Sequence, residues 1–126
     1  MNLPNVLLWL GAAFFAGYGL AFIFAPEAMA VFVTGSAPSG ASAMIDFRAT
    51  YGGMTLGVGL ILGICARTPD YSRLGLQALA ISMATMASGR SVGIALDGSP
   101  NAMMLLFLAL EIIVLSLSLL GLRKTP

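Results

Sequence analysis

Charge, histidine and cysteine are all scarce in this chain, and each shortage excludes a class of protein. Charged residues make up 9% of the 126 positions, whereas soluble domains carry about 25%. A chain that is 59% hydrophobic would not stay in water as a monomer. The net charge is +1 and the basic residues form no cluster. We therefore expect no nucleic-acid partner, because such partners need a basic surface.

The shortage of metal-binding side chains narrows the chemistry further. The chain has no histidine and a single cysteine, Cys65. Zinc, haem and iron–sulfur sites need several such ligands. We expect none of these groups and no disulfide within the chain. The sequence does not identify any cofactor. No base is placed to activate a serine or threonine hydroxyl as a nucleophile, so the sequence predicts a protein that is not an enzyme.

Long apolar runs are what the sequence has instead. An apolar helix of roughly 18 residues or more can cross a bilayer core that is about 30 Å thick, and four runs reach that length. The sequence predicts a single all-α transmembrane domain over residues 1–126, a polytopic four-helix bundle with up-down-up-down topology. The transmembrane helices are expected at residues 4–25, 43–66, 69–96 and 100–122, with an interfacial helix at 26–33 that begins at Pro26.

Lysine and arginine near the helix ends predict the orientation. With four crossings, all of them fall on the side of the N-terminus: Arg67, Arg73, Arg123 and Lys124. The opposite side has Glu27 and Asp97 and no basic loop residue. The positive-inside rule therefore predicts that both termini lie in the cytoplasm.

A few ionisable residues interrupt the apolar runs at similar depth. At 1.5 Å per residue, Arg48 lies about 28 Å, Arg90 about 25 Å and Glu111 about 18 Å from the cytoplasmic ends of their helices. Asp46 lies within one turn of Arg48. A charge at the centre of a membrane helix costs about 2.5–3.5 kcal/mol, so we expect these side chains to face inward and pair. Long arginine side chains bend along the axis, and we expect Arg48 or Arg90 to reach Glu111.

Two interpretations of this polar cluster remain open. One is a structural clamp, in which ion pairs fix the helix register. The other is a ligand-binding pocket in the outer half of the bilayer, where two guanidinium groups suit a phosphate, a carboxylate or a quinone carbonyl. The candidate site residues are Asp46, Arg48, Tyr51, Arg90, Asp97 and Glu111.

Small residues recur at the spacing that lets membrane helices approach closely. Three GxxxG pairs occur: Gly53 and Gly57, Gly59 and Gly63, and Gly89 and Gly93. We expect them to pack within the bundle, with homo-oligomer formation as the second interpretation.

Two sequence motifs resemble a known family. They are DFRATYGGMTLGVGL at 46–60 and GRSVGIALDGSP at 89–100, followed by Glu111 and a terminal LRK. The chain resembles a group of small bacterial four-helix membrane proteins known only as a domain of unknown function. The resemblance covers nearly the whole chain and implies four helices, but it assigns no activity. The architecture is also similar to small four-helix proteins that accompany membrane oxidoreductases.

These observations favour a non-enzymatic protein of the bacterial inner membrane. We expect it to bind a lipid, a quinone or a similar amphiphile at Arg48, Arg90 and Glu111. One alternative is an accessory or assembly subunit of a larger membrane complex, whose polar cluster is structural. A second alternative is a proton-coupled transporter with Glu111 as its titrating group. The expected partners are membrane lipids, with a second copy or a larger membrane complex as further candidates.

Overall fold

A computed structural model describes residues 2–124, and every regular element in that part of the chain is helical. The elements are α1 (Leu3–Phe24), α2 (Pro26–Thr34), α3 (Ala41–Phe47), the π-helix η1 (Arg48–Met54), α4 (Thr55–Arg67), the 3₁₀ turn η2 (Pro69–Tyr71), α5 (Ser72–Asp97) and α6 (Ala102–Arg123). Four spans are long and apolar enough to cross a membrane: α1, α3 to α4, η2 to α5, and α6. This confirms the predicted all-α, multi-pass fold, with boundaries that differ by one or two residues.

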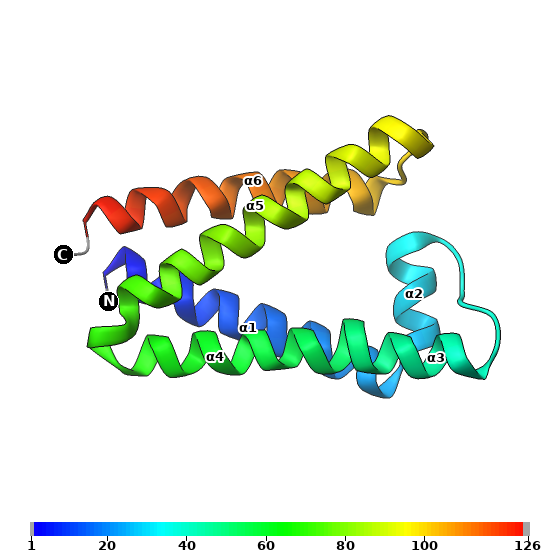
Figure 1. Cartoon of the computed structure of the whole chain (residues 1–126), viewed down its shortest axis with the longest axis horizontal. Helices are drawn as coiled ribbons and strands as arrows, with labels where there is room; N and C mark the ends of the chain where they lie inside the picture. Colours follow the sequence, from blue (N-terminus) through cyan, green and yellow to red (C-terminus); the bar gives the residue numbers. More distant parts are fainter. Residues whose placement is uncertain (1, 125–126) are drawn as a thin grey trace.

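The spans alternate in direction, so the two termini lie at the same end of the molecule (Figure 1). We call this the terminal end, and we call the opposite end, which bears α2, the α2 end. The turn between α4 and α5 belongs to the terminal end, and the connection from α5 to α6 belongs to the α2 end. Each of the four spans therefore runs from the terminal end to the α2 end.

The short helix α2 is held against the start of α6. Proline at its first position, Pro26, favours helix initiation, and Gly35 ends it with a φ of 84° that suits glycine. Asn101 caps α6, because its Oδ1 accepts a hydrogen bond from Met104 N at 2.9 Å. The same side chain donates from Nδ2 to the carbonyl oxygen of Val33 at 3.0 Å. One asparagine thus joins the end of α2 to the beginning of α6.

The first and second spans pack backbone against backbone. A Cβ atom added at Gly59 would lie 2.5 Å from Ala16 N, and one added at Gly19 would lie 2.5 Å from Leu56 N. Both distances are shorter than real Cβ contacts, so only glycine allows this approach. Gly59 belongs to one of the predicted GxxxG pairs and packs within the bundle, as expected.

The second span changes its winding where it reaches the α2 end. The sequence predicts one continuous helix, but the structure has a π-helix over the seven residues of η1. The hydroxyl of Thr55 follows this segment and donates to the carbonyl oxygens of Tyr51 and, at 3.1 Å, of Gly52. Segments of π-helix within α-helices occur frequently at functional sites.

The four spans form two helix pairs, α1 with the second span and α5 with α6, and α5 is buried against the other pair only near the terminal end. The core there consists mainly of apolar side chains: Leu7, Leu8, Ala12, Phe15, Leu62, Cys65, Ala66, Leu76, Leu79 and Met83. All buried residues of α5 lie between Gly75 and Met83, and its second half has none. The pairs therefore diverge towards the α2 end.

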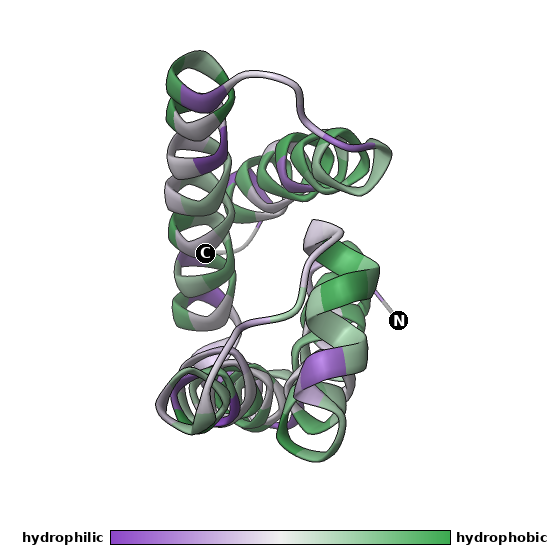
Figure 2. Ribbon diagram, turned by 90° about the vertical axis from the view of Figure 1, so that its right-hand side faces the viewer, coloured by the Kyte–Doolittle hydropathy of each residue, from purple (hydrophilic) through white to green (hydrophobic). Residues whose placement is uncertain are grey.

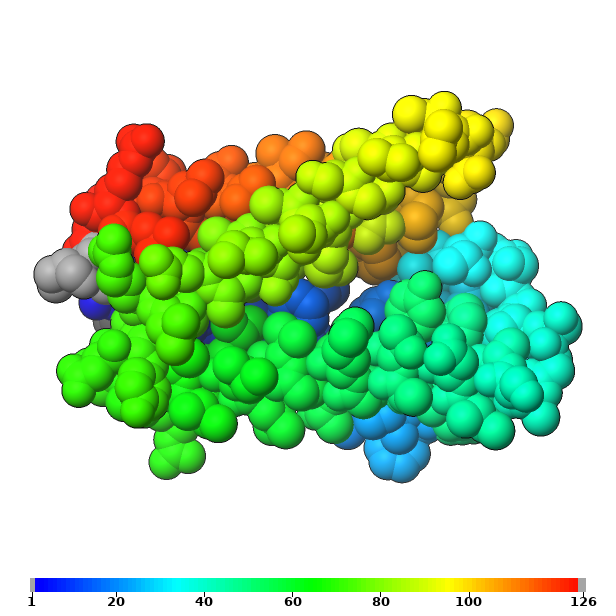
Figure 3. Space-filling view, viewed as in Figure 1, coloured from blue at the N-terminus to red at the C-terminus, as the bar shows by residue number. Residues whose placement is uncertain are grey.

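The space between the diverging pairs is closed differently on its two sides. Helix α2 lies between α1 and α6, as the view from the α2 end shows (Figure 2). On the other side, a hollow separates α5 from the second span (Figure 3). We call this hollow the lateral cleft.

Candidate functional site

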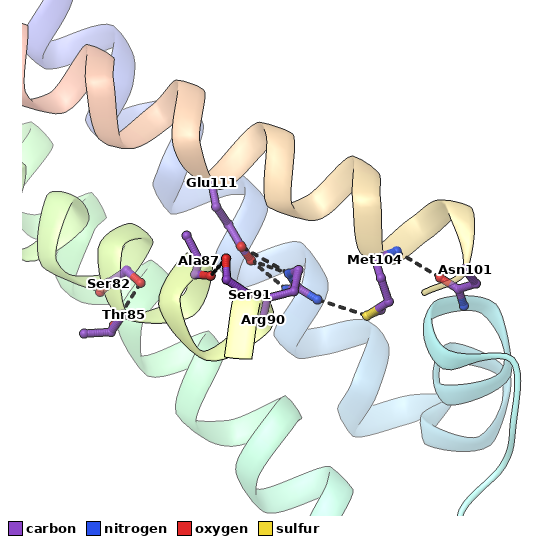
Figure 4. Close-up of polar contacts among 8 residues, drawn as sticks. All are labelled: Ser82, Thr85, Ala87, Arg90, Ser91, Asn101, Met104 and Glu111. Atoms are coloured by element: carbon purple, nitrogen blue, oxygen red, sulfur yellow. Dashed lines mark hydrogen bonds and ion pairs between the residues drawn. The ribbon is translucent and has the colours of Figure 1, made fainter. Parts of the chain in front are cut away.

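An ion pair between α5 and α6 is the centre of the candidate site (Figure 4). Arg90 Nη2 lies 2.6 Å from Glu111 Oε1, and Arg90 Nε lies 3.1 Å from Oε2 and 3.2 Å from Oε1. The side chain of Glu111 is 5% exposed and that of Arg90 is 17% exposed. Arg90 lies in the second half of α5, where no residue is fully buried, and its guanidinium contacts α6. The sequence analysis expected either arginine of the cluster to reach Glu111, and the structure pairs Glu111 with Arg90.

One face of α6 supplies the remaining contacts of Arg90. Nη1 donates to Met104 Sδ at 3.1 Å, and the guanidinium carbon lies 5.4 Å from the centre of the Phe107 ring. Met104, Phe107 and Glu111 share this face because they are spaced by three and four residues. Neither Met104 nor Phe107 was among the site residues predicted from the sequence, although both are spaced from Glu111 so that they share its face of α6. Thioether sulfur is a weak acceptor, so Nη1 retains the capacity to bind an oxygen.

A row of aromatic rings leads from Arg90 to the second span. The row joins α6, α1, η1 and α3 through ring contacts that are 4.8–6.3 Å between centroids. In order, its members are Phe107, Tyr18, Phe22, Tyr51 and Phe47. Tyr51, the predicted site residue among them, is 45% exposed.

Two predicted site residues lie elsewhere on the second span. Arg48 Nη1 donates to the carbonyl oxygen of Ile23 and so stabilises the last turn of α1, where backbone carbonyls lack helical partners. Asp46 is exposed and accepts a hydrogen bond from Thr50 Oγ1 at 3.2 Å. The expected pair of guanidinium groups therefore does not form. Depth along the axis, which the helical rise estimates from the sequence, does not fix the direction in which a side chain points.

Asp97 lies near the ion pair, at the end of α5. It shares a face of α5 with Arg90 and Gly93, and its Oδ2 would lie 3.9 Å from a Cβ atom added at Gly93. A pocket of about 370 Å³ at the α2 end is lined by Arg90, Asp97, Met104 and Thr34, among others. We call this the α2-end pocket. Arg90 and Asp97 therefore line one pocket, with no direct contact between their side chains.

A larger hollow of about 690 Å³ lies at the terminal end, beside the start of α1 and η2. It contains Arg73 and Lys124 but none of the buried charges. Its lining comes from chain ends and a turn, so it is separate from the ion pair.

Within residues 2–124, no group of three or more His, Cys, Asp or Glu side chains is placed to hold a metal ion. A family model described as a domain of unknown function (DUF4345) matches residues 3–122. The chain belongs to the DUF4345 family. This confirms the family resemblance seen in the sequence. No curated protein and no solved structure matches the chain. DUF4345 membership assigns no activity, so the function of this member is inferred from its site.

Proposed function

We propose that this protein is a non-enzymatic, amphiphile-binding protein of the bacterial inner membrane. The polar group of a lipid, a quinone or a similar molecule binds at Arg90, and its hydrocarbon part lies in the lateral cleft. The observation that carries this proposal is the position of the Arg90–Glu111 ion pair. It is buried within the bundle, yet it lies where the helix pairs separate rather than where they pack.

A buried ion pair by itself adds little to the free energy of unfolding. Replacing a buried ion pair with apolar residues is often neutral or stabilising, so its presence here suggests another role. Ionisable residues inside membrane proteins are also expensive and are commonly functional. Arg90 uses Nε and Nη2 on Glu111, while Nη1 has only a sulfur acceptor among the described residues. In a purely structural ion pair, we would expect an oxygen atom of the protein to accept from Nη1 as well. A phosphate or carbonyl oxygen of a ligand would supply this stronger acceptor.

The walls of the cleft suit a hydrocarbon chain. The second span, which forms one wall, carries Tyr51, which stacks on the buried ring of Phe22 and leaves almost half of its own surface exposed, at 45%. A lipid chain that moves from the bilayer into this cleft gains little from the hydrophobic effect, since both environments are apolar. The selectivity of binding must therefore come from the polar group and from the fit of the chain. We therefore expect the contacts that distinguish one amphiphile from another to be made at Arg90.

Orientation follows from the basic residues, which lie at the terminal end: Arg67, Arg73, Arg123 and Lys124. The α2 end has the acidic residues Glu27 and Asp97. The positive-inside rule supports cytoplasmic termini, and with that orientation the proposed site would lie in the outer leaflet. The ligand would then enter from the outer leaflet of the inner membrane.

The proposal is tested by identifying small molecules that remain bound to purified protein. The protein is extracted in a mild detergent, washed extensively and analysed by native mass spectrometry and solvent extraction. Wild-type protein should retain about one amphiphile per chain. The double variant Arg90→Gln/Glu111→Gln keeps a neutral, hydrogen-bonding pair and should lose most of it. The control Arg67→Gln alters an exposed arginine at the opposite end and should retain the wild-type amount.

Two results would overturn the proposal. The first is protein that carries no amphiphile after gentle extraction. The second is equal retention by wild type and by the double variant, which would place binding elsewhere. A stoichiometric larger protein in the same preparation, without a bound amphiphile, would instead support the accessory-subunit alternative.

A further inference from the structure

We infer that the polar group bound at the α2-end pocket is a zwitterionic phospholipid headgroup with a primary ammonium. Its phosphate binds Arg90 and its ammonium binds Asp97. This inference rests on the proposed function and names the class of amphiphile. The arrangement of charge around Gly93 carries it.

The positive part of the pocket is the outer edge of Arg90. Glu111 occupies Nε and Nη2, which leaves Nη1 directed towards Met104, nearer the α2 end. Both Arg90 and Met104 line the α2-end pocket. Met104 is flexible and can yield to a ligand. Nη1 is thus placed to bind one phosphate oxygen.

The negative part of the pocket is Asp97. Its carboxylate points back along α5 to Gly93 and has no hydrogen-bond or ion-pair partner among residues 2–124. Asp97 lies seven residues beyond Arg90, which is about 10.5 Å along the helix axis, and Gly93 lies between them. The absence of a side chain at Gly93 leaves open space between the two charged residues. An ethanolamine group places its ammonium two methylene carbons beyond the phosphate ester, so that one headgroup, with a hydrogen bond at each end, bridges Arg90 and Asp97 across Gly93.

The balance of charge favours this headgroup over an anionic one. The site contains two carboxylates, Glu111 and Asp97, against the single guanidinium of Arg90. An anionic headgroup would add a further negative charge, whereas a zwitterion brings its own cation to Asp97. A primary ammonium donates three hydrogen bonds. The carboxylate of Asp97 and the hydroxyl of Ser99, which both line the pocket, are suitable acceptors. A choline group has no such donor.

The test compares three synthetic dioleoyl lipids that differ only in the headgroup: ethanolamine, choline and glycerol. Delipidated full-length protein is titrated with equal mixtures, and bound lipid is counted by native mass spectrometry. Wild type should prefer the ethanolamine lipid by about two- to fivefold, the range for an exposed ion pair. Asp97→Asn should remove this preference while phospholipid still binds. The matched control Asp70→Asn, at the terminal end, should leave it unchanged.

A second pair of variants tests the pocket itself. Gly93→Leu adds a side chain between Arg90 and Asp97 without a backbone clash, since only Asp97 Oδ2 lies within 4 Å of the new Cβ. It should reduce binding of all three lipids. Gly89→Leu makes the same change one turn earlier, where nothing lies within 4 Å, and should bind as wild type does.

Several outcomes would overturn this inference. A preference for the glycerol lipid, or equal binding of the ethanolamine and choline lipids, would show that Asp97 does not select an ammonium. Retention of a neutral quinone with no phospholipid would also overturn the inference, because a quinone has neither a phosphate nor an ammonium. In these cases the proposed function stands, because an amphiphile is still bound. Loss of every amphiphile from the wild-type protein would overturn both.

Discussion

The ion pair between Arg90 and Glu111 supports a quantitative prediction about folding. Removing one partner of a buried pair leaves an uncompensated charge and costs about 3–5 kcal/mol. Because Glu111 is 5% exposed and Arg90 17% exposed, both single variants should be strongly destabilised. Arg90→Gln and Glu111→Gln combined leave two neutral amides, which should return stability to within about 1 kcal/mol of wild type. The coupling free energy, by which the double variant costs less than the two single variants together, should then be about 5 kcal/mol or more.

The assay is equilibrium unfolding in mixed micelles with increasing denaturing detergent. Unfolding is followed by the fluorescence of Trp9, the chain's single tryptophan. Arg67→Gln and Asp70→Asn, alone and together, form the matched cycle. Both residues are exposed at the terminal end, and their coupling should lie between 0 and about 1 kcal/mol. Additive effects of the Arg90 and Glu111 variants would refute the pairing, since two independent residues cannot compensate each other.

Three further predictions concern the packing and the placement of the bundle. Gly59→Ala places a methyl group 2.5 Å from the α1 backbone, whereas ordinary contacts begin at 3.4 Å. It should lower the free energy of unfolding by about 1–3 kcal/mol in the same assay. Gly57→Ala, with nothing within 4 Å, is its control and should be neutral or slightly stabilising. Asn101→Ala removes both the cap of α6 and the link to α2, and should cost about 1–2 kcal/mol and speed hydrogen exchange in α2. In whole cells, a membrane-impermeant thiol reagent should label Ser36→Cys but not Thr68→Cys, in a chain with Cys65 replaced by Ala.

Each of these has a clear contrary result. Equal stability of the two alanine variants would show that the helices are not in backbone contact at Gly59. Unchanged exchange in α2 after Asn101→Ala would mean that other contacts hold that helix. Labelling of Thr68→Cys with protection of Ser36→Cys would reverse the proposed orientation.

The fold could be predicted largely from the sequence because a bilayer restricts the choices. Apolar runs of this length must be helical, and Pro26 and the Asp97–Pro100 turn mark where they stop. The predicted boundaries lie within two residues of the structure for this reason. The π-helix was not predicted. It lies within a run whose composition suits an ordinary helix, and it occurs where Gly52 meets Ile23 of α1.

The candidate site could be predicted in part. The rise per residue places Arg90 and Glu111 within several ångströms of each other in depth, and arginine is long enough to bridge that difference. The same reasoning included Arg48, which binds the carbonyl oxygen of Ile23 instead. Depth does not reveal which side of the bundle a residue faces. The facing side depends on how the two helix pairs are arranged, which one sequence does not give. For the same reason, the lateral cleft and its row of aromatic rings could not be inferred from one sequence.

The central claim is that a membrane amphiphile occupies the space between the two helix pairs at the α2 end. The most direct measurement is an experimental structure of the protein in nanodiscs made from native membranes. We expect elongated density in the lateral cleft, between α5 and the second span, with a polar end within hydrogen-bonding distance of Arg90 Nη1. A structure in which α5 packs directly against η1, with the cleft filled by the protein's own side chains, would contradict the claim.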